Sequence, residues 1–421
     1  MSRPERPVRV VAIADSDSYL KWAAALLDQL VNAAPSGWTG TTVLLNAPTA
    51  PDRIQVRAAL SPGRRVLTLG APALLRELTR DPPDVVLLAC TGPVVAWLLR
   101  RRAFRGPDRP LILSGLPGMA LPATARGWEM RRGIDLFVTH SRVEQAAYEV
   151  LRRPGHEPVV ALTRLPFVPV ERTSAGAAIP ATVRPLRPRV VFAAQPSVPA
   201  APVQRCAILR ALADLAASRP DLDVVVKLRA RRGQAQTHRE DHPYPDLWRD
   251  LVAAGAVEPG SVRFADGAMR EQLIGASGLV TVSSTAVLEA MAAGLAVRVL
   301  GDFGVDDVML TRVFIGSGVI GDLDDLRAGS FRRPDPSWCA ANYFHPVRED
   351  TFGPTLVEMV GQRRVRPPAP RLDLPPVPRP SAVAELRAAV RLALPPPWSR
   401  ALSNARRRGR SPAHDGADQP A

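Results

Sequence analysis

From Val8 onward, short β-branched runs alternate with longer helical patterns, and this alternation limits the fold of the chain more than any other feature. It is typical of βαβ units, in which a helix returns the chain to start the next parallel strand. In the first half we expect strands at Val8–Ala14, Thr41–Leu45, Val85–Ala89, Leu111–Ser114, Leu136–Thr139 and Val159–Leu162. Helices are expected between them at Tyr19–Asn32, Ala71–Arg80, Pro93–Arg101 and Ser141–Arg152.

A second α/β pattern follows a break at residues 166–188, where periodicity is lost and prolines and small residues gather, as in a linker. Its expected strands are Arg189–Ala193, Leu222–Leu228, Ser261–Phe264, Gly278–Val282 and Ala296–Leu300. Its expected helices are Pro202–Ser218, Pro245–Ala254, Met269–Ala276, Thr285–Ala293 and Asp306–Ile315. The sequence therefore predicts an α/β protein with two doubly wound, Rossmann-like domains facing a cleft.

We place the first domain at residues 1–165, the linker at 166–188, the second domain at 189–365 and a tail at 366–421. The tail holds 12 of the 44 prolines and ten arginines against four acidic residues. Apart from one helical pattern at Ser381–Leu394, such a composition cannot bury enough apolar surface to fold by itself, so we expect mostly disorder.

Arginine supplies nearly all of the positive charge, since only Lys21 and Lys227 among 55 cationic residues are lysines, and the net charge is +15. GC-rich codon usage would produce that skew without a functional cause. Aromatic residues interleaved with basic ones, which stack on nucleic-acid bases, are missing from the expected domains. We therefore expect no specific nucleic-acid partner.

The remaining composition argues for a cytoplasmic protein. The cysteines are odd in number and widely spaced (Cys90, Cys206 and Cys339), which disfavours a disulfide framework and a cysteine zinc site. The N-terminus has no signal-peptide pattern, and the longest apolar run, Val85–Leu99, is too short to cross a bilayer. We expect no cofactor and no bound metal, because the nearest match to a metal motif, Asp15-Ser16-Asp17, is weak.

The most informative stretch is GLVTVSSTAVLEAMAAG, at residues 278–294. An expected strand delivers Ser283, Ser284 and Thr285 to the start of a helix, where hydroxyls and backbone N–H groups favour an anion such as a nucleotide phosphate. Glu289 follows about one helical turn later. In the competing interpretation these hydroxyls only cap the helix and Glu289 is an ordinary surface residue.

Further candidates follow other expected strands. Lys227 and Arg229 end the strand VVVKLR and could neutralise a leaving phosphate. Thr237 and His238, or His242, could contribute to the same site from the loop beyond. In the alternative interpretation this stretch is only a solvated, charged loop. Asp302 follows the last strand, at residues 296–300. The segment 342–345, NYFH, either contacts a ligand or packs as an aromatic crossover.

In the first domain, Asp15 and Asp17 follow the first strand, where a carboxylate could accept a proton, although either could simply cap the helix. His140 ends a strand and is either catalytic or structural. Ser141 and Glu144 just beyond it are spaced for a capping box. The loop at Gly115–Gly118, which follows an expected strand, does not match GxGxxG, and GxxxxGK[ST] is absent from the sequence, so Rossmann dinucleotide and P-loop sites are disfavoured.

The motif TVSSTAVLEAMAAG resembles the donor half of GT-B glycosyltransferases, more distantly of the bacterial capsule and sialyl type and of CDP-glycerol glycerophosphotransferases with a Ser-Ser motif. The runs VVVKLRAR, GQAQTHREDHPYPDL, DFGV, FIGSGV and NYFHP are most similar to a family of predicted glycosyltransferases from GC-rich bacteria. The likeness spans roughly residues 8–350. It implies that the first domain takes the acceptor and the second the nucleotide-sugar donor, without a metal. The related families end the strand at Lys227 with Lys-x-His-Pro, whereas this chain has Arg229 and Ala230 at the last two positions.

We therefore expect a glycosyltransferase that moves a sugar from a nucleotide-activated donor to a cell-envelope or other glycan acceptor, which could be lipid-linked. In this hypothesis Ser283, Ser284 and Thr285 bind the donor phosphate, and Asp15 or Asp17 is the base. Alternatives are a nucleotide-sugar epimerase, a glycerophosphotransferase or a non-catalytic envelope scaffold. Trp398 and Arg400–Arg410 could attach the enzyme to an anionic membrane at the inner face, bind nucleic acid nonspecifically, or have no role.

Overall fold

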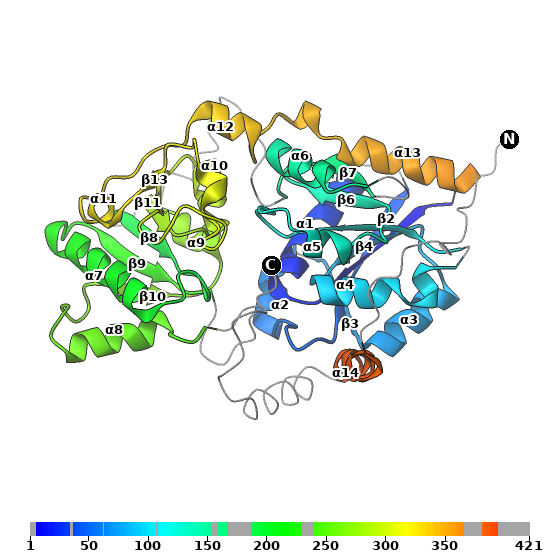
Figure 1. Cartoon of the computed structure of the whole chain (residues 1–421), viewed down its shortest axis with the longest axis horizontal. Helices are drawn as coiled ribbons and strands as arrows, with labels where there is room; N and C mark the ends of the chain where they lie inside the picture. The colour runs from blue at the N-terminus through cyan, green and yellow to red at the C-terminus, as the bar shows by residue number, and fades with distance from the viewer. Residues whose placement is uncertain are drawn as a thin grey trace. The chain divides into compact units, whose positions relative to one another are not determined.

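The computed structural model describes residues 6–33, 37–61, 63–106, 108–153, 158–166, 168, 187–229, 240–365 and 381–394. They form two compact units. The first unit contains the described residues of Met1–Pro166 and Pro346–Ala421, and the second contains those of Phe167–Gln234 and His238–His345. Each unit has its own parallel sheet and its own hydrophobic core (Figure 1).

The sheet of the first unit has seven parallel strands in the order β3-β2-β1-β4-β5-β6-β7. The strands are β1 (Val8–Ala14), β2 (Trp38–Leu45), β3 (Val66–Leu69), β4 (Val85–Ala89), β5 (Leu111–Gly115), β6 (Leu136–Thr139) and β7 (Val159–Leu162). Strands β4, β5 and β6 are buried at every residue, as expected of apolar strands in a parallel sheet covered on both faces. The chain leaves β1 toward β2 and later returns to its other side with β4, so a topological switch point lies between β1 and β4.

Helices connect these strands and cover the sheet. They are α1 (Asp17–Ala33), α2 (Arg53–Ala59), α3 (Ala71–Arg80), α4 (Gly92–Leu99), α5 (Ala125–Glu129) and α6 (Arg142–Val150), with a short 3-10 turn η1 (Arg102–Phe104). In α1 the buried residues Leu20, Ala23, Leu27 and Leu30 recur at helical spacing, and this apolar stripe packs on the sheet.

The sheet of the second unit has six parallel strands in the order β10-β9-β8-β11-β12-β13. The strands are β8 (Arg189–Ala193), β9 (Asp223–Lys227), β10 (Arg263–Ala265), β11 (Ala276–Thr281), β12 (Ala296–Leu300) and β13 (Ile320–Gly321). The helical segments are α7 (Pro202–Ser218), α8 (Tyr244–Ala253), α9 (Met269–Leu273), α10 (Ala286–Ala292), η2 (Arg312–Phe314), α11 (Leu323–Arg327) and α12 (Pro336–Ala341). Here the switch point lies between β8 and β11.

The segment after the second sheet returns to the first unit. It forms η3 (Val347–Glu349), α13 (Phe352–Val365) and α14 (Ala382–Ala393). Thr351 fixes the return, because its N–H donates to the Leu162 carbonyl and its Oγ1 accepts from Leu162 N, both at 2.9 Å, at the end of edge strand β7. The structure thus ends the second unit at His345 rather than at the expected residue 365.

The sequence pattern missed some elements and misplaced one. It did not predict the short edge strands β3 and β13, or the helices α2, α5, α11, α12 and α13. The helix expected at Asp306–Ile315 is wrong: Leu310 has a left-handed φ of 57°, and Thr311 Oγ1 donates to the Gly304 carbonyl, which holds a turn. Only the 3-10 turn η2 forms in that region.

Two expectations for the later part of the chain are met. Segment 342–345 is a packed aromatic crossover, with Tyr343 and His345 fully buried. The helix predicted near the C-terminus forms as α14. The remaining tail residues, 366–380 and 395–421, and most of the expected linker lie outside the described residues. Among the helices that the structure describes, none has the length and apolar character needed to cross a membrane.

Candidate active site

Gln195 bridges the switch point of the second unit. It lies two residues beyond β8, and Ser283 lies two residues beyond the neighbouring strand β11. The Gln195 side chain donates from Nε2 to Ser283 Oγ at 3.0 Å and accepts at Oε1 from Ser283 N at 2.8 Å. This two-point contact fixes the first of the three predicted hydroxyl residues.

Ser284 and Thr285 complete the turn from β11 into α10, and both are partly exposed. Thr285 is the N-cap residue of α10 and makes no side-chain capping bond, while Ser284 Oγ accepts from Ala286 N at 3.3 Å. The backbone N–H groups of Val287 and Leu288 donate to the carbonyls of Ser284 and Thr285. Because the first N–H groups of α10 already have acceptors, any anion bound here would depend mainly on the hydroxyls.

Lys227 is the last residue of β9, the strand beside β8, and its side chain is buried. Its ammonium donates to the carbonyl of the next residue, Leu228. Arg229 follows and is exposed. The strand order β9-β8-β11 therefore brings Lys227 and Arg229 to the same edge of the sheet as Ser283.

The other residues predicted in the second unit are Glu289, Asp302, Thr237 and His238. Glu289 lies in α10, about one turn beyond Thr285, and is partly exposed. Asp302 follows β12, and its Oδ1 accepts from Leu323 N, the first N–H group of α11, at 3.1 Å. Thr237 and His238 lie outside the described residues.

Arg205, which the sequence pattern did not single out, organises the loops at this edge. Its guanidinium is buried and donates to the carbonyls of Gln195 at 3.1 Å and His242 at 2.9 Å, and to Glu240 Oε1 at 2.7 Å. Burial raises the pKa of Glu240, and Arg205 opposes that rise. The sequence did contain a signal for this role, because Arg205 lies on the apolar face of α7, which also buries Ile208 and other aliphatic residues.

In the first unit, Asp15 occupies the corresponding position at the switch point but is fully buried. Its Oδ2 accepts from Thr91 N at 2.9 Å and from Thr91 Oγ1 at 2.6 Å, which ties the end of β1 to the start of α4. Burial raises the pKa of Asp15, opposed by the Thr91 hydrogen bonds and by the nearby positive charge of Arg131. The proton-accepting role predicted for Asp15 does not fit a carboxyl without solvent access.

Arg131 covers the start of α4. Its Nη2 donates to Tyr19 Oη at 3.0 Å and to the Cys90 carbonyl at 3.2 Å. A Cβ built on Gly92 would lie 2.8 Å from Met130 Sδ and 3.3 Å from Arg131 Nη1, so these side chains pack directly against the helix start. The buried Tyr19 has a pKa raised to about 12, chiefly by desolvation.

Asp17 differs from Asp15 because it is only partly buried, at the first position of α1. Its Oδ2 accepts from Lys21 Nζ at 3.1 Å, and its Oδ1 is buried without a hydrogen-bond partner. The sequence interpretation of a helix-start carboxylate is consistent with this position.

His140 is fully buried, and partners hold both of its ring nitrogens. Nδ1 lies 3.1 Å from the Thr163 carbonyl, and Nε2 lies 2.7 Å from Trp22 Nε1. A carbonyl accepts only, and an indole nitrogen donates only, so these contacts assign a neutral ring protonated at Nδ1. This arrangement favours the structural alternative for His140.

The expected capping box at Ser141 forms only in part. Ser141 Oγ accepts from Glu144 N at 3.0 Å, as predicted. The buried Glu144 carboxylate instead accepts from the backbone N–H groups of His140 at 2.8 Å and Ala120 at 2.7 Å. Glu144 thus joins the loop after β5 to the end of β6.

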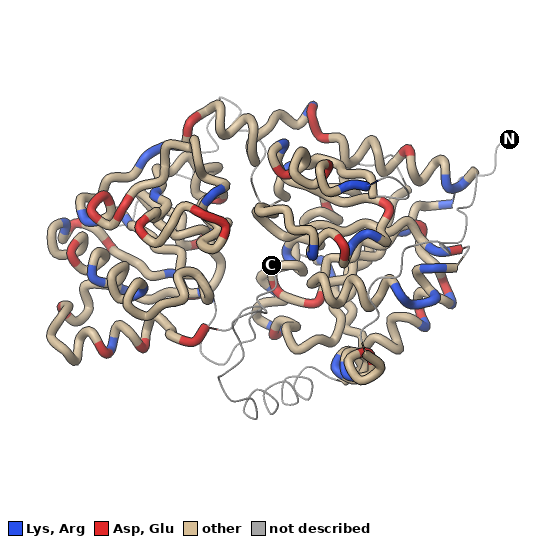
Figure 2. The backbone as a smooth tube through the Cα atoms, viewed as in Figure 1, with Lys and Arg blue, Asp and Glu red and all other residues tan. Residues whose placement is uncertain are grey.

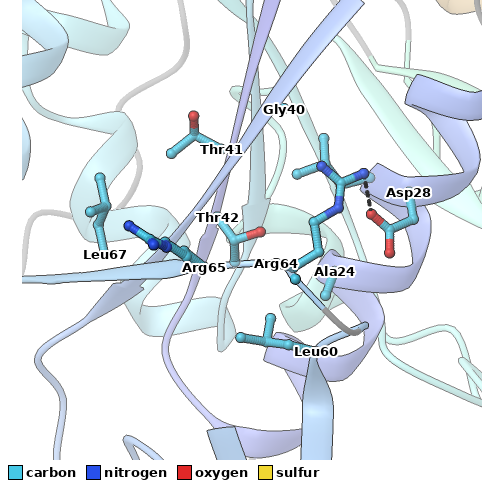
Figure 3. A pocket seen from close by; sticks show the side chains of 11 residues that line it. Ala24, Asp28, Gly40, Thr41, Thr42, Leu60, Arg64, Arg65 and Leu67 are labelled. Carbon is cyan, nitrogen blue, oxygen red and sulfur yellow. Dashed lines mark ion pairs between the residues drawn. The ribbon is translucent and has the colours of Figure 1, made fainter. Parts of the chain in front are cut away.

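A separate pocket of about 300 Å³ lies in the first unit, toward the amino ends of β2 and β3 (Figure 3). Thr41, Thr42, Arg64 and Arg65 line it over an aliphatic floor, and Arg64 pairs with Asp28 at 2.6 Å. No predicted site residue lines this pocket. Across the described ranges, no group of three or more His, Cys, Asp and Glu side chains is arranged to hold a metal ion.

Solved structures show which fold the two sheets form. UDP-GlcNAc 2-epimerase from Neisseria meningitidis, bound to UDP-GlcNAc, is 12% identical with a TM-score of 0.53. The Methanocaldococcus jannaschii UDP-GlcNAc 2-epimerase is 9% identical with a TM-score of 0.52. HepE of Anabaena, in complex with UDP and glucose, is 12% identical with a TM-score of 0.50. Each comparison covers 84% of this chain and 100% of the other, and shows a GT-B-like pair of α/β domains.

Sequence comparison gives the family. No curated protein matches the chain. The family model described as "Putative glycosyltransferase (DUF6716)" matches residues 10–359, which is most of the chain and includes the strands of both sheets. The chain therefore belongs to this glycosyltransferase family.

Proposed function

We propose that the second unit binds a nucleotide-activated sugar at its switch point and that the protein transfers this sugar to a cell-envelope or other glycan acceptor. The observation that carries the proposal is the pair of partly exposed hydroxyl residues, Ser284 and Thr285, beside the Gln195–Ser283 bridge. Ligands of open α/β sheets bind at this position. Similarly folded proteins solved with UDP or UDP-GlcNAc support a nucleotide-sugar donor.

In the proposed reaction the hydroxyls of Ser283, Ser284 and Thr285 donate to the donor phosphate. Lys227 and Arg229 offset the negative charge that grows on the nucleotide as its bond to the anomeric carbon breaks. Glu289 orients the donor.

Asp17 is the proposed base: it accepts the proton of the acceptor hydroxyl, whose oxygen forms the new bond to the anomeric carbon. The Asp17 side chain is partly exposed, which supports this role over the fully buried Asp15 and His140.

The first test measures nucleotide binding by calorimetry with CMP, CDP, UDP and GDP, using the full-length protein. We expect one of them to bind and Thr285→Val to weaken that binding roughly tenfold, the effect of losing one hydrogen bond to a charged group. Thr41→Val, which alters the pocket of the first unit, is the matched control and should leave the affinity unchanged. Absence of binding by all four nucleotides, or equal losses in both variants, would contradict the proposed site.

The second test separates transfer from epimerisation. With the nucleotide sugar that binds, a glycosyltransferase releases nucleotide only when an acceptor is present, whereas an epimerase forms product without one. Lys227→Ala should abolish nucleotide release, with circular dichroism as the check on folding. Unchanged turnover would remove Lys227 from the mechanism.

We also infer that the C-terminal tail brings the protein to an anionic membrane surface. The support is sequence alone, in Trp398 and the arginines from Arg400 to Arg410, all beyond the described residues. Co-sedimentation with anionic vesicles, lost when Arg406, Arg407 and Arg408 are replaced by serine in the full chain, tests this contact. Undiminished sedimentation of the substituted protein would exclude it.

A further inference from the structure

Helix α14 presents an apolar stripe to solvent. Val383, Leu386 and Val390, spaced three and four residues apart, are 55%, 65% and 41% exposed. At this spacing the three side chains share one face of the helix. Exposed single aliphatic residues are common, but three in line on one helix are typical of a surface with a partner.

The opposite face of α14 fixes the helix to the first unit (Figure 1). Leu392 is only 4% exposed, and Ala388 and Ala389 pack on the core of that unit. At the end of the helix, the Ala393 carbonyl lies 3.1 Å from where a Cβ on Gly70 would be, so the backbones approach closely. The exposed stripe therefore belongs to a docked helix and cannot be buried by simply rotating α14.

Glu385 adds an ionic contact that sets the orientation of the helix. Its carboxylate pairs with Arg100 at 3.0 Å and also with Arg101. Because Glu385 is the one acidic residue of α14 and is held by these arginines, the charge left on the outer side of the helix is positive. Arg387 is exposed beside Leu386, and blue marks the arginines of α14 in Figure 2.

We propose that this outer face of α14, defined by Val383, Leu386, Arg387 and Val390, binds an anionic lipid bilayer in the plane of its surface. An apolar stripe flanked by arginine is the pattern of helices that lie at a membrane interface. In the sequence beyond α14, Trp398 is followed by five arginines between residues 400 and 410. Stable attachment generally needs two such signals, and the helix and the arginines supply one each.

A bilayer fits this face better than a protein partner does. Three aliphatic residues on twelve helical positions are a small patch, whereas stable protein interfaces bury about 800 Å² on each side. The outer face also has no acidic residue to match the basic groups of a partner. The contact is independent of the sugar-transfer proposal, since it involves none of the candidate site residues.

The test is co-sedimentation of the full-length protein with vesicles of phosphatidylcholine, alone or mixed with phosphatidylglycerol. We expect binding to the mixed vesicles, and Leu386→Glu should weaken it roughly tenfold by placing a charge in the apolar stripe. Ile54→Glu is the matched control, because Ile54 is 71% exposed on α2 and should not contribute. Circular dichroism confirms that both variants fold.

Three results would overturn the proposal. Leu386→Glu could bind the mixed vesicles as well as the parent protein does, which would leave attachment to the tail arginines alone. Leu386→Glu and Ile54→Glu could lose binding equally, which would indicate a general charge effect. Light scattering could show that the parent is a dimer and Leu386→Glu a monomer, without vesicle binding by either, which would make the stripe a contact between copies.

Discussion

In both units a hydrogen-bonded pair links two strand ends at the switch point, but the two pairs differ in their exposure to solvent. In each, a residue just beyond the first strand bonds to a residue two positions beyond the neighbouring strand: Asp15 to Thr91 in the first unit, and Gln195 to Ser283 in the second. The Asp15 bridge is buried beneath Arg131 and Tyr19, whereas the Gln195 bridge leads into the partly exposed Ser284 and Thr285.

This difference shows that a polar residue at a strand end is not by itself a functional residue. The buried carboxylate joins two secondary-structure elements, and its solvent access is lost because Arg131 and Met130 pack on the helix start. The amide bridge leaves hydroxyls beside it partly exposed. The variants below test whether stability and ligand binding really divide between the two positions in this way.

The largest expected effect is that of Arg205→Met. The substitution leaves Glu240 without its cationic partner and frees the Gln195 loop, so we expect a loss of about 3–5 kcal/mol in the free energy of unfolding. Urea denaturation with hydrogen exchange would locate the loss in the second unit. Arg210→Met on the exposed side of α7 is the control, and Glu240→Gln should make the effect of Arg205→Met smaller. Equal losses for both arginine variants would contradict a specific role.

The next effect concerns the buried bridge of the first unit. Asp15→Ala removes the acceptor for the Thr91 N–H and should cost about 1–3 kcal/mol. It should leave nucleotide affinity unchanged under conditions in which the protein is folded. A loss of nucleotide binding with intact folding would return Asp15 to the list of functional candidates.

Asp15→Asn tests the pH dependence of the same bridge. Burial raises the Asp15 pKa above its ordinary value of 3.8, so the folded chain holds this proton more tightly than the unfolded chain does. The contribution of Asp15 to stability is therefore fully present below pH 3.8 and declines as the pH rises through the folded pKa. The stability of Asp15→Asn relative to the parent should increase over the same interval, measured by urea unfolding at a series of pH values. A difference independent of pH would show that the carboxyl is not perturbed.

The smallest effect on stability, and the sharpest on binding, is expected for Gln195→Ala. Because Gln195 is partly exposed, we expect a loss of no more than about 1 kcal/mol in stability but roughly tenfold weaker nucleotide binding, since Ser283 loses its support. Thr91→Val breaks the equivalent bond in the first unit and should have the opposite profile. Calorimetry gives the loss of nucleotide affinity in both variants, and urea denaturation gives the loss of stability. If the two variants lose affinity and stability to the same extent, the proposed difference between the two switch points is wrong.

Much of the fold follows from local sequence pattern. The strands Val8–Ala14, Val85–Ala89, Leu136–Thr139 and Ala296–Leu300 have the predicted bounds, because each is a short run rich in β-branched and aliphatic residues, interrupted by Arg9 in the first strand and Arg298 in the last. The family match also confirms the predicted resemblance to glycosyltransferases. Short elements such as β3 and β13 were missed, since four or two residues have too little periodicity to stand out.

The sequence by itself determined the α/β class, the order of the elements and the strand-end positions of Asp15, Lys227 and Ser283. These properties depend on residue periodicity and capping over a few neighbouring residues. The tertiary structure alone decided that Gln195 meets Ser283, that Arg205 holds the surrounding loops and that Asp15 and His140 are buried. Neighbouring strand ends and solvent access are set by crossovers and by packing between distant segments, which no local pattern records.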